Sequence, residues 1–302
     1  MRFFPCALAA GLLVASFPVT ARPLDAAQGG PSVVDIQSLM TTPVWLLDGR
    51  RQVSQGTGFF YGNLRPDGVA DAIFLVTNYH VVTGHAPKDP KPRSGDRIQF
   101  ALHKNADDLE NVVQYELPLY NARNEPIWVA SEQYPNADVV LVPLPTPILP
   151  LYVFTEEHTR SDLKIRVTSG ATLLGYPYGF FDRKHLLPIW KTGHVASEPD
   201  VDFEGEPTFL VDVSAFPGMS GSPVIAIMTG IYESEDGVMR SGRVRKLMGI
   251  FSSMPVINRP RRSDTAGDAP RPQPQVTAET SLQLGYVWKA ALIADMARGY
   301  RR

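Results

Sequence analysis

The chain of 302 residues carries 29 basic and 31 acidic side chains, which gives a formal charge of −2 at pH 7. This near balance excludes binding of nucleic acid through a bulk positive surface, and it excludes an acidic disordered tail. A single cysteine excludes a disulfide scaffold, a structural zinc site with cysteine ligands and an iron–sulfur cluster. Hydrophobic residues make up 44% of the chain, which is enough for a buried core.

Residues 1–21 have the pattern of a secretory signal peptide. Arg2 precedes an almost wholly apolar stretch, and small residues end it at Ala21, where we expect cleavage. The apolar stretch is shorter than the ~20 residues that a spanning helix needs, and Pro5 and Pro18 interrupt it. An uncleaved anchor is the alternative. After cleavage we expect no cysteine and no stable membrane insertion, in an exported protein that is periplasmic or secreted.

Residues 22–257 predict an all-β structure. Short runs rich in Val, Ile, Phe and Leu alternate with Pro, Gly, Asn and Asp, a pattern typical of a β-barrel or sandwich. The runs cover residues 56–61, 72–77, 97–102, 112–117, 138–144, 165–168, 171–175, 193–196, 209–213, 223–228 and 246–251. Prolines between Pro143 and Pro150 indicate a boundary between two halves of similar strand content, residues 22–150 and 151–257.

The last part of the chain has a different composition. Residues 258–278 are rich in Pro, Arg and Gln, so we expect a flexible loop with no core to bury, or alternatively a basic docking loop. Residues 279–302 place Leu282, Val287 and Ile293 loosely on one face, which predicts a C-terminal helix. Before them, residues 234–245 predict a polar hairpin that turns at Asp236-Gly237.

Three segments carry groups suited to nucleophilic catalysis. His80 directly follows an apolar strand, Asp138 starts another, and Ser220 lies between glycines before a third. A serine hydroxyl needs a base to take its proton, and histidine titrates near neutrality. A buried carboxylate orients the imidazole and stabilises its cation, and such an acid is costly unless it is hydrogen-bonded. The three residues together predict a catalytic triad.

The glycines around Ser220 fit a second requirement of this chemistry. Attack on a carbonyl creates an oxyanion, which preorganised N–H donors stabilise. The backbone N–H groups of Gly218 and Ser220 could supply them, with Met219 holding the turn in between. Glycine at position 218 gives the backbone the freedom that this turn requires.

The order of the groups excludes an α/β-hydrolase, which needs a helix after the serine and a histidine last in the chain. Here Pro223 opens a strand-like run, and the last histidine is His194. The chain contains neither a His-Glu-x-x-His motif nor a Gly-x-x-x-x-Gly-Lys phosphate loop. The remaining histidines are scattered, so we expect no metal site and no cofactor.

Thr77-Asn-Tyr-His80, Asp138-Val-Val-Leu and Gly218-Met-Ser220-Gly-Ser-Pro-Val resemble the three motifs of the chymotrypsin/trypsin-like serine peptidases. They are closest to the bacterial exported branch with glutamyl-endopeptidase-like and heat-shock-type members. The resemblance covers roughly residues 56–254 and the terminal helix. It implies two packed six-stranded antiparallel β-barrels with a C-terminal α-helix. His80 and Asp138 would come from the first barrel and Ser220 from the second, with the triad in the cleft between them.

The resemblance implies a serine endopeptidase that forms an acyl-enzyme intermediate on Ser220. Its partners would be protein or peptide substrates, and we expect no nucleic acid. Two alternatives stay open: a non-catalytic binding or scaffolding module with the same fold, and an esterase that uses the same triad. The sequence leaves the oligomeric state open. Met219 replaces the aspartate that pairs with a new amino terminus in animal members, so we do not expect activation by that route.

The resemblance also implies a primary substrate pocket. It places Ser214 at the base, and Ser252, Ser253 and Met254 along the wall, with Ser252 matching a serine that supports the catalytic aspartate. No carboxylate marks the pocket floor, and Phe251 stands where glutamate-specific members carry a histidine. We therefore expect the pocket to take a small or medium apolar residue.

Overall fold

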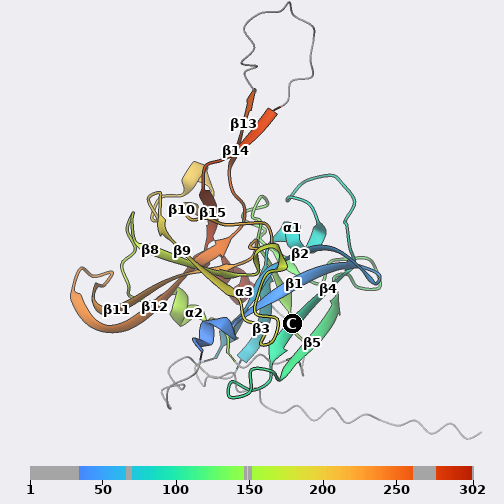
Figure 1. The fold of residues 1–302 in the computed structure, drawn as a ribbon, viewed down its shortest axis with the longest axis horizontal. Coiled ribbons are helices and arrows are strands. Elements are labelled where there is room, and N and C mark those ends of the chain that lie inside the picture. Colours follow the sequence, from blue (N-terminus) through green and yellow to red (C-terminus); the bar gives the residue numbers. More distant parts are fainter. Residues whose placement is uncertain (1–33, 66–69, 146–147, 149–151, 261–276, 301–302) are drawn as a thin grey trace, which may run out of the picture.

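The computed structural model describes residues 34–65, 70–145, 148, 152–260 and 277–300. Two antiparallel sheets dominate the molecule, and the helices are short (Figure 1). The predicted all-β fold of two packed antiparallel β-barrels with a C-terminal helix is confirmed, and the first half has seven strands where six were expected. The predicted signal peptide of residues 1–21 lies outside the described residues.

The first half is a seven-stranded antiparallel sheet in the order β5-β4-β1-β2-β3-β7-β6. The seventh strand, β6, has only two residues and lies at the edge beside β7. Buried aliphatic and aromatic side chains, such as Phe60, Leu75 and Phe100, fill the interior of this first half. The elements are η2 (Ile36–Ser38), β1 (Thr41–Asp48), β2 (Arg51–Leu64), β3 (Ala70–Thr77), α1 (Tyr79–Thr83), β4 (Arg97–His103), β5 (Val112–Pro118), β6 (Val129–Ala130) and β7 (Val140–Pro143).

The second half is a closed six-stranded barrel in the order β10-β15-β12-β11-β8-β9. Leu173, Val211 and Val224 are among the buried residues of its core. Its elements, with the short helices beside them, are α2 (Glu156–Thr159), β8 (Gly170–Gly175), η3 (Pro177–Gly179), β9 (Ile189–Val195), η4 (Phe203–Gly205), β10 (Thr208–Asp212), β11 (Pro223–Glu233), β12 (Met239–Phe251), β15 (Leu284–Lys289) and α3 (Ala290–Gly299).

The C-terminal segment differs from the helix predicted over residues 279–302. Residues 284–289 form strand β15, which pairs with β10 and β12 and closes the barrel, and α3 begins only at Ala290. Within β15 the buried Gly285 and Val287 alternate with the partly exposed Leu284 and Tyr286. This period of two is that of a strand with one buried face.

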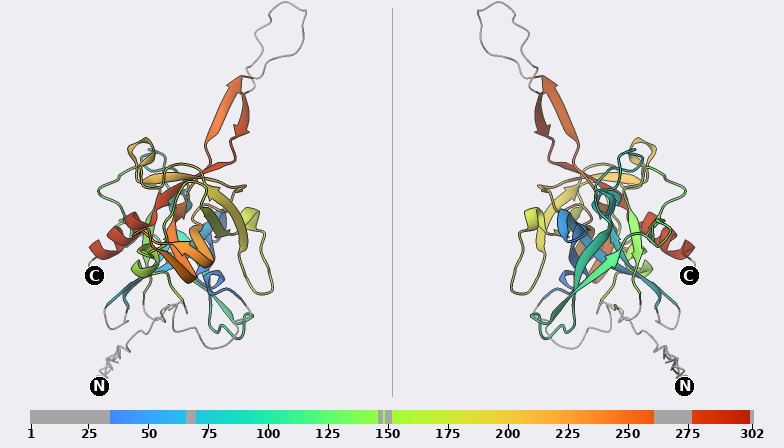
Figure 2. Two further views of the ribbon diagram at one scale, coloured as in Figure 1. Left: turned by 90° about the vertical axis from the view of Figure 1, so that its left-hand side faces the viewer. Right: turned by 90° about the vertical axis from the view of Figure 1, so that its right-hand side faces the viewer.

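The predicted flexible loop of residues 258–278 also differs at both of its ends. Strands β13 (Val256–Pro260) and β14 (Thr277–Ser281) pair antiparallel and extend away from the body of the molecule (Figures 1 and 2). We expected a loop because this stretch lacks apolar side chains for a core, but two strands can pair through backbone hydrogen bonds without such side chains. Residues 261–276 lie outside the described residues.

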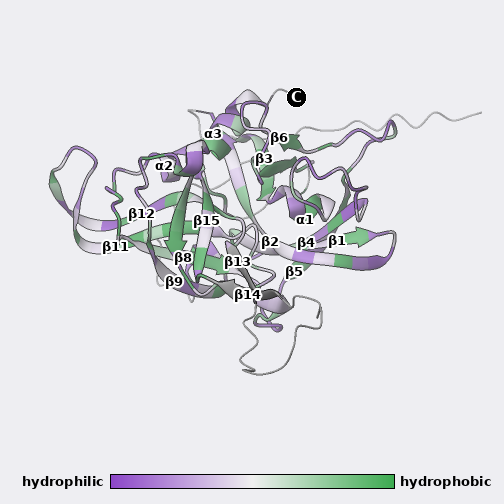
Figure 3. Cartoon of the chain, turned by 90° about the horizontal axis from the view of Figure 1, so that it is seen from above, coloured by the Kyte–Doolittle hydropathy of each residue, from purple (hydrophilic) through white to green (hydrophobic). Residues whose placement is uncertain are grey.

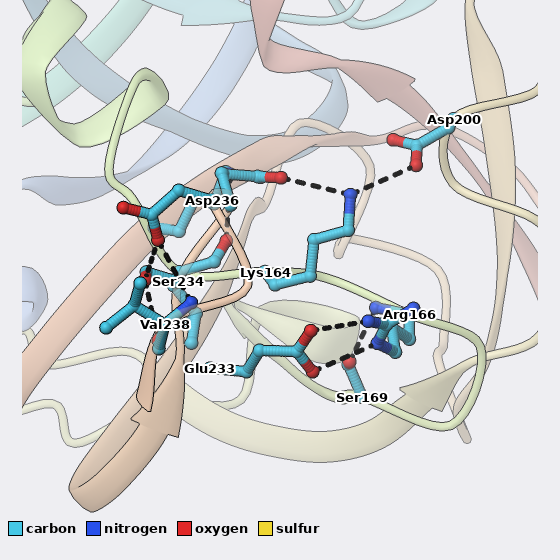
Figure 4. A network of polar contacts seen from close by, with 11 residues as sticks. Lys164, Arg166, Ser169, Asp200, Glu233, Ser234, Asp236 and Val238 are labelled. Atoms are coloured by element: carbon cyan, nitrogen blue, oxygen red, sulfur yellow. Dashed lines mark hydrogen bonds and ion pairs between the residues drawn. The ribbon is translucent and has the colours of Figure 1, made fainter. Parts of the chain in front are cut away.

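Strands β11 and β12 form the hairpin predicted around Asp236-Gly237, and both strands are longer than expected. A set of surface contacts, here called the hairpin network, joins it to the segment before β8 (Figure 4). Arg166 pairs with Glu233 at 2.6 Å, and Lys164 pairs with Glu235 at 3.1 Å. At the turn, Asp236 accepts a hydrogen bond from the Val238 N–H.

Hydrophobic residues are concentrated on the strands, and hydrophilic residues are concentrated on the connecting loops (Figure 3). Within the part of the chain that the structure describes, no helix combines the length and the apolar character needed to cross a membrane.

Candidate active site

His80 and Asp138 lie close together because strand β3 of the first half ends where the neighbouring strand β7 begins. Thr77 at the end of β3 pairs with Val140 at the start of β7, so the residues just beyond each strand lie close together. The His80 Nδ1 lies 2.7 Å from the Asp138 Oδ2. The backbone N–H of His80 donates to the other carboxylate oxygen at 2.9 Å. The pair is thus held by both the ring and the main chain.

Further hydrogen bonds are made to Asp138, which is only 7% exposed. The Ser252 hydroxyl donates to Oδ2 at 2.5 Å, and the Asn78 side-chain amide donates to the Asp138 backbone carbonyl at 2.6 Å. A buried acid is costly without such donors. With the carboxylate as acceptor, Nδ1 of a neutral His80 ring carries the proton, and Nε2 keeps its lone pair.

Ser220 is linked to the acid through Ser252. Its hydroxyl donates to the Ser252 backbone carbonyl at 3.0 Å. The hydrogen bonds found for the described residues include none between the Ser220 hydroxyl and His80. Ser252 therefore contacts both groups, with its side chain on the carboxylate and its carbonyl on the alcohol.

The loop that carries Ser220 requires two glycines. Gly218 and Gly221 have φ angles of +95° and +90°, a region where L side chains are strained. A Cβ at position 221 would lie 1.9 Å from the Thr57 carbonyl oxygen, so no side chain fits there. Met219 is fully buried in the core of the second barrel, which anchors the loop by packing.

Thr57 on β2 holds this loop from the first half of the molecule. Its N–H donates to the Ser220 carbonyl at 2.8 Å, and its hydroxyl donates to the Gly218 carbonyl at 2.8 Å. Its own carbonyl accepts from the Thr77 hydroxyl at 2.7 Å. Sequence reasoning did not single out Thr57 or Asn78. The signal for Thr57 was its place between Gly56 and Gly58, where other segments of the chain approach the backbone closely.

The orientation of the loop leaves two N–H groups unused. The Pro217 carbonyl accepts a hydrogen bond from the Tyr178 N–H at 2.6 Å. In a planar trans peptide the following N–H points the opposite way, so the Gly218 N–H points away from Tyr178. Among the residues described, neither the Gly218 N–H nor the Ser220 N–H donates to a protein acceptor.

A cavity of about 530 Å³ lies beside the His80–Asp138 pair, and Gly218 and Ser220 are not among the residues that line it. Ser252 and Ser253 line it together with His80 and Asp138. The other two residues predicted for the substrate pocket do not line this cavity. Ser214 is exposed after β10, and Met254 is partly buried against the core of the second barrel. The full lining is His80, Ala86, Pro87, Asn136, Asp138, Phe203, Glu204, Glu206, Thr208, Ser252, Ser253, Tyr286 and Trp288.

Several solved structures are similar to this chain at low sequence identity. A serine endoprotease from Yersinia pestis is 14% identical with a TM-score of 0.45, over 87% of this chain and 64% of that one. This chain therefore spans slightly less than two thirds of that protein. The inactive mutant form of Rv3671c from M. tuberculosis is 16% identical with a TM-score of 0.43, over 93% and 96%. Human heparin binding protein is 11% identical with a TM-score of 0.46, over 90% and 95%.

No curated protein matches the sequence. The family model described as the trypsin-like peptidase domain matches residues 56–230, which is more than half of the chain and includes His80, Asp138 and Ser220. The chain therefore belongs to the trypsin-like peptidase domain family.

Proposed function

We propose that the protein is a serine endopeptidase whose catalytic groups are His80, Asp138 and Ser220. The observation that carries the proposal is the hydrogen-bonded His80–Asp138 pair, which Ser252 connects to a serine on a glycine-flanked loop. Family membership supports peptidase activity. The roles of the individual residues are our inference from their chemistry.

In the proposed reaction the Ser220 side chain turns from the Ser252 carbonyl to the Nε2 of His80. Nε2 takes the hydroxyl proton while Oγ bonds to the substrate carbonyl carbon. Asp138 stays ionised and stabilises the imidazolium. The N–H groups of Gly218 and Ser220, with Met219 holding the turn between them, donate to the oxyanion.

The intermediate then collapses. The C–N bond breaks, the imidazolium gives its proton to the leaving amine, and an ester on Ser220 remains. Water attacks this ester while Nε2 takes one of its protons, and the proton returns to the Ser220 oxygen as the acid product leaves. Each half of the reaction returns His80 to its neutral form, so the cycle needs no cofactor.

The proposal includes the finer expectations from the sequence. We propose a small or medium apolar residue in a primary pocket formed by Ser214, Ser252, Ser253 and Met254. Dominant cleavage after Glu or Arg in a peptide library would contradict this preference. We also propose export in the bacterial branch of the family. Mass spectrometry of the purified exported protein should find Arg22 at the amino terminus.

A fluorophosphonate probe tests the catalytic proposal directly. Mature protein should label stoichiometrically, the Ser220→Ala variant should not label, and mature protein should cleave casein or peptides. The contact between the Ser220 hydroxyl and the Ser252 carbonyl favours one alternative, a binding module that keeps the fold without turnover. A well-folded protein that never labels would support that module, and labelling with ester turnover alone would support an esterase.

A further inference from the structure

The cavity beside His80 extends beyond the catalytic groups and has a largely aromatic wall. Phe203, Tyr286 and Trp288 of the second half line one part of it, and Ala86 and Pro87 of the first half line another. Its volume of about 530 Å³ is within the range of cavities that enclose a ligand group. The space is therefore large enough for a long side chain of a bound peptide.

The charged groups that line this cavity are unbalanced. Its acidic side chains are Glu204, Glu206 and Asp138, and His80 is its only lining residue that can become positive. In the described ranges, neither Glu204 nor Glu206 forms an ion pair with Lys or Arg. Glu206 accepts a hydrogen bond from the Asn136 side-chain amide at 2.9 Å, which orients it across the two halves.

The turn that carries the two glutamates is held in place. Glu204 and Gly205 have φ angles of +55° and +81°, so the chain reverses sharply between the two glutamates. The Phe203 ring contacts the Tyr286 ring with centroids 6.1 Å apart. Asp202 at the start of the turn pairs with Lys289 at 2.7 Å, so that cation is already occupied. Glu204 and Tyr286 line the same cavity, and burial, and after it the charge of Glu204, raises the pKa of Tyr286.

We propose that this cavity selects a long cationic side chain, Lys or Arg, at a position close to the scissile bond of the substrate. This inference rests on the proposed endopeptidase function and extends it to a second recognition position. The aliphatic stem packs on the aromatic wall, and the cationic head lies over the rings and meets the glutamates. Acidic side chains at the same position are repelled.

A peptide library tests the proposal, with the four positions on either side of the cleaved bond varied one at a time. At one position we expect about tenfold higher kcat/KM for Lys than for norleucine, which keeps the stem and lacks the charge. In the Glu204→Gln/Glu206→Gln variant this ratio should fall to about twofold or less. Glutamine at position 206 can still accept the hydrogen bond from Asn136.

Two further variants sharpen the experiment. Glu204→Gln alone changes an exposed side chain and guards against misfolding of the double variant, and its ratio should also fall. Glu157→Gln removes an exposed carboxylate on α2 that does not line the cavity, so its ratio should stay at the wild-type value. A melting curve for each variant shows that it is folded.

The outcomes separate the inference from the proposed function. A preference for Lys or Arg that depends on the two glutamates supports the inference. Peptide cleavage without such a preference overturns the inference and leaves the endopeptidase in place. A preference that the Glu204→Gln variant and the Glu204→Gln/Glu206→Gln variant both retain has the same consequence. No cleavage of any peptide removes the proposed function and the inference with it.

Discussion

Two polar networks of this molecule differ in burial and in the kind of groups they use. Around Asp138, a few hydrogen bonds from His80 and Ser252 converge on one carboxylate that is 7% exposed. The hairpin network joins many charged side chains at the surface, and the Arg166 side chain is 62% exposed. Exposed ion pairs contribute little to stability, whereas a buried charge depends on every donor it has. The number of ion pairs in a network is therefore a poor guide to how much that network contributes to the stability of this protein.

Replacing His80 by alanine should have the largest effect on activity. Without the base, the Ser220 hydroxyl keeps its proton, and kcat/KM for a peptide should fall by about 10⁵-fold or more. The side chain is partly exposed, so the melting temperature should change little. Steady-state kinetics and a thermal melt measure both effects. A variant that keeps a tenth of the wild-type activity would contradict the proposed role.

Asp138→Asn tests the buried network at its centre. The carboxylate accepts at both oxygens, at Oδ1 from the His80 backbone N–H and at Oδ2 from the His80 ring and Ser252. An amide can accept at only one of these positions and presents an NH₂ group at the other, so the ring can lose its fixed tautomer. We expect kcat/KM to fall by about 10⁴-fold, with a smaller effect on substrate binding. Kinetics over a range of substrate concentrations separates kcat from KM. A loss seen only in KM would mean that Asp138 acts on binding instead.

Ser252→Ala removes one donor and keeps the backbone carbonyl that Ser220 contacts. The buried carboxylate then lacks a hydrogen bond, so the free energy of unfolding should fall by about 2 kcal/mol. We expect kcat/KM to fall by about tenfold because His80 still holds the acid. Urea unfolding and peptide kinetics measure the two effects. Ser241→Ala, at an exposed serine of β12 that lines neither the cavity nor the proposed primary pocket, is the matched control.

The smallest effect is expected in the hairpin network, through Asp236. Bonds from the Ser234 hydroxyl, the Val238 N–H and Arg240 lower the pKa of Asp236 from 3.8 to about 2. A pKa that is lowered on folding adds stability above about pH 3.8, and this contribution is lost as the pH falls through about 2. Urea midpoints of wild type and Asp236→Asn should therefore differ slightly at pH 6 and converge towards pH 2. A constant difference would show that the charge is not responsible.

The sequence predicted those parts of the site that one residue and its immediate neighbours define. Asp138 at the start of an apolar strand indicated a buried acid that needs donors, and the donors are present. The glycines at 218 and 221 indicated a special backbone, and both have positive φ. Thr57 could not be found in this way, because its role depends on how β2 of the first half meets the loop of the second.

The fold shows the same division between local and long-range information. Most strands followed from short apolar runs, and the hairpin at Asp236 followed from its turn residues. Strand β15 was not predicted because residues such as Val287 fit the spacing of a helix as well as that of a strand. Only its partners β10 and β12, which lie elsewhere in the chain, decide between the two.

The hydrogen bonds from Thr57 have a consequence for when the molecule can act. The loop of Ser220 belongs to the second barrel, yet Thr57 of the first half fixes its two key carbonyls. A chain whose halves have not yet docked lacks this brace, and its nucleophile has no defined setting. If Ser220 is the nucleophile that we propose, peptidase activity therefore requires the two halves to be docked.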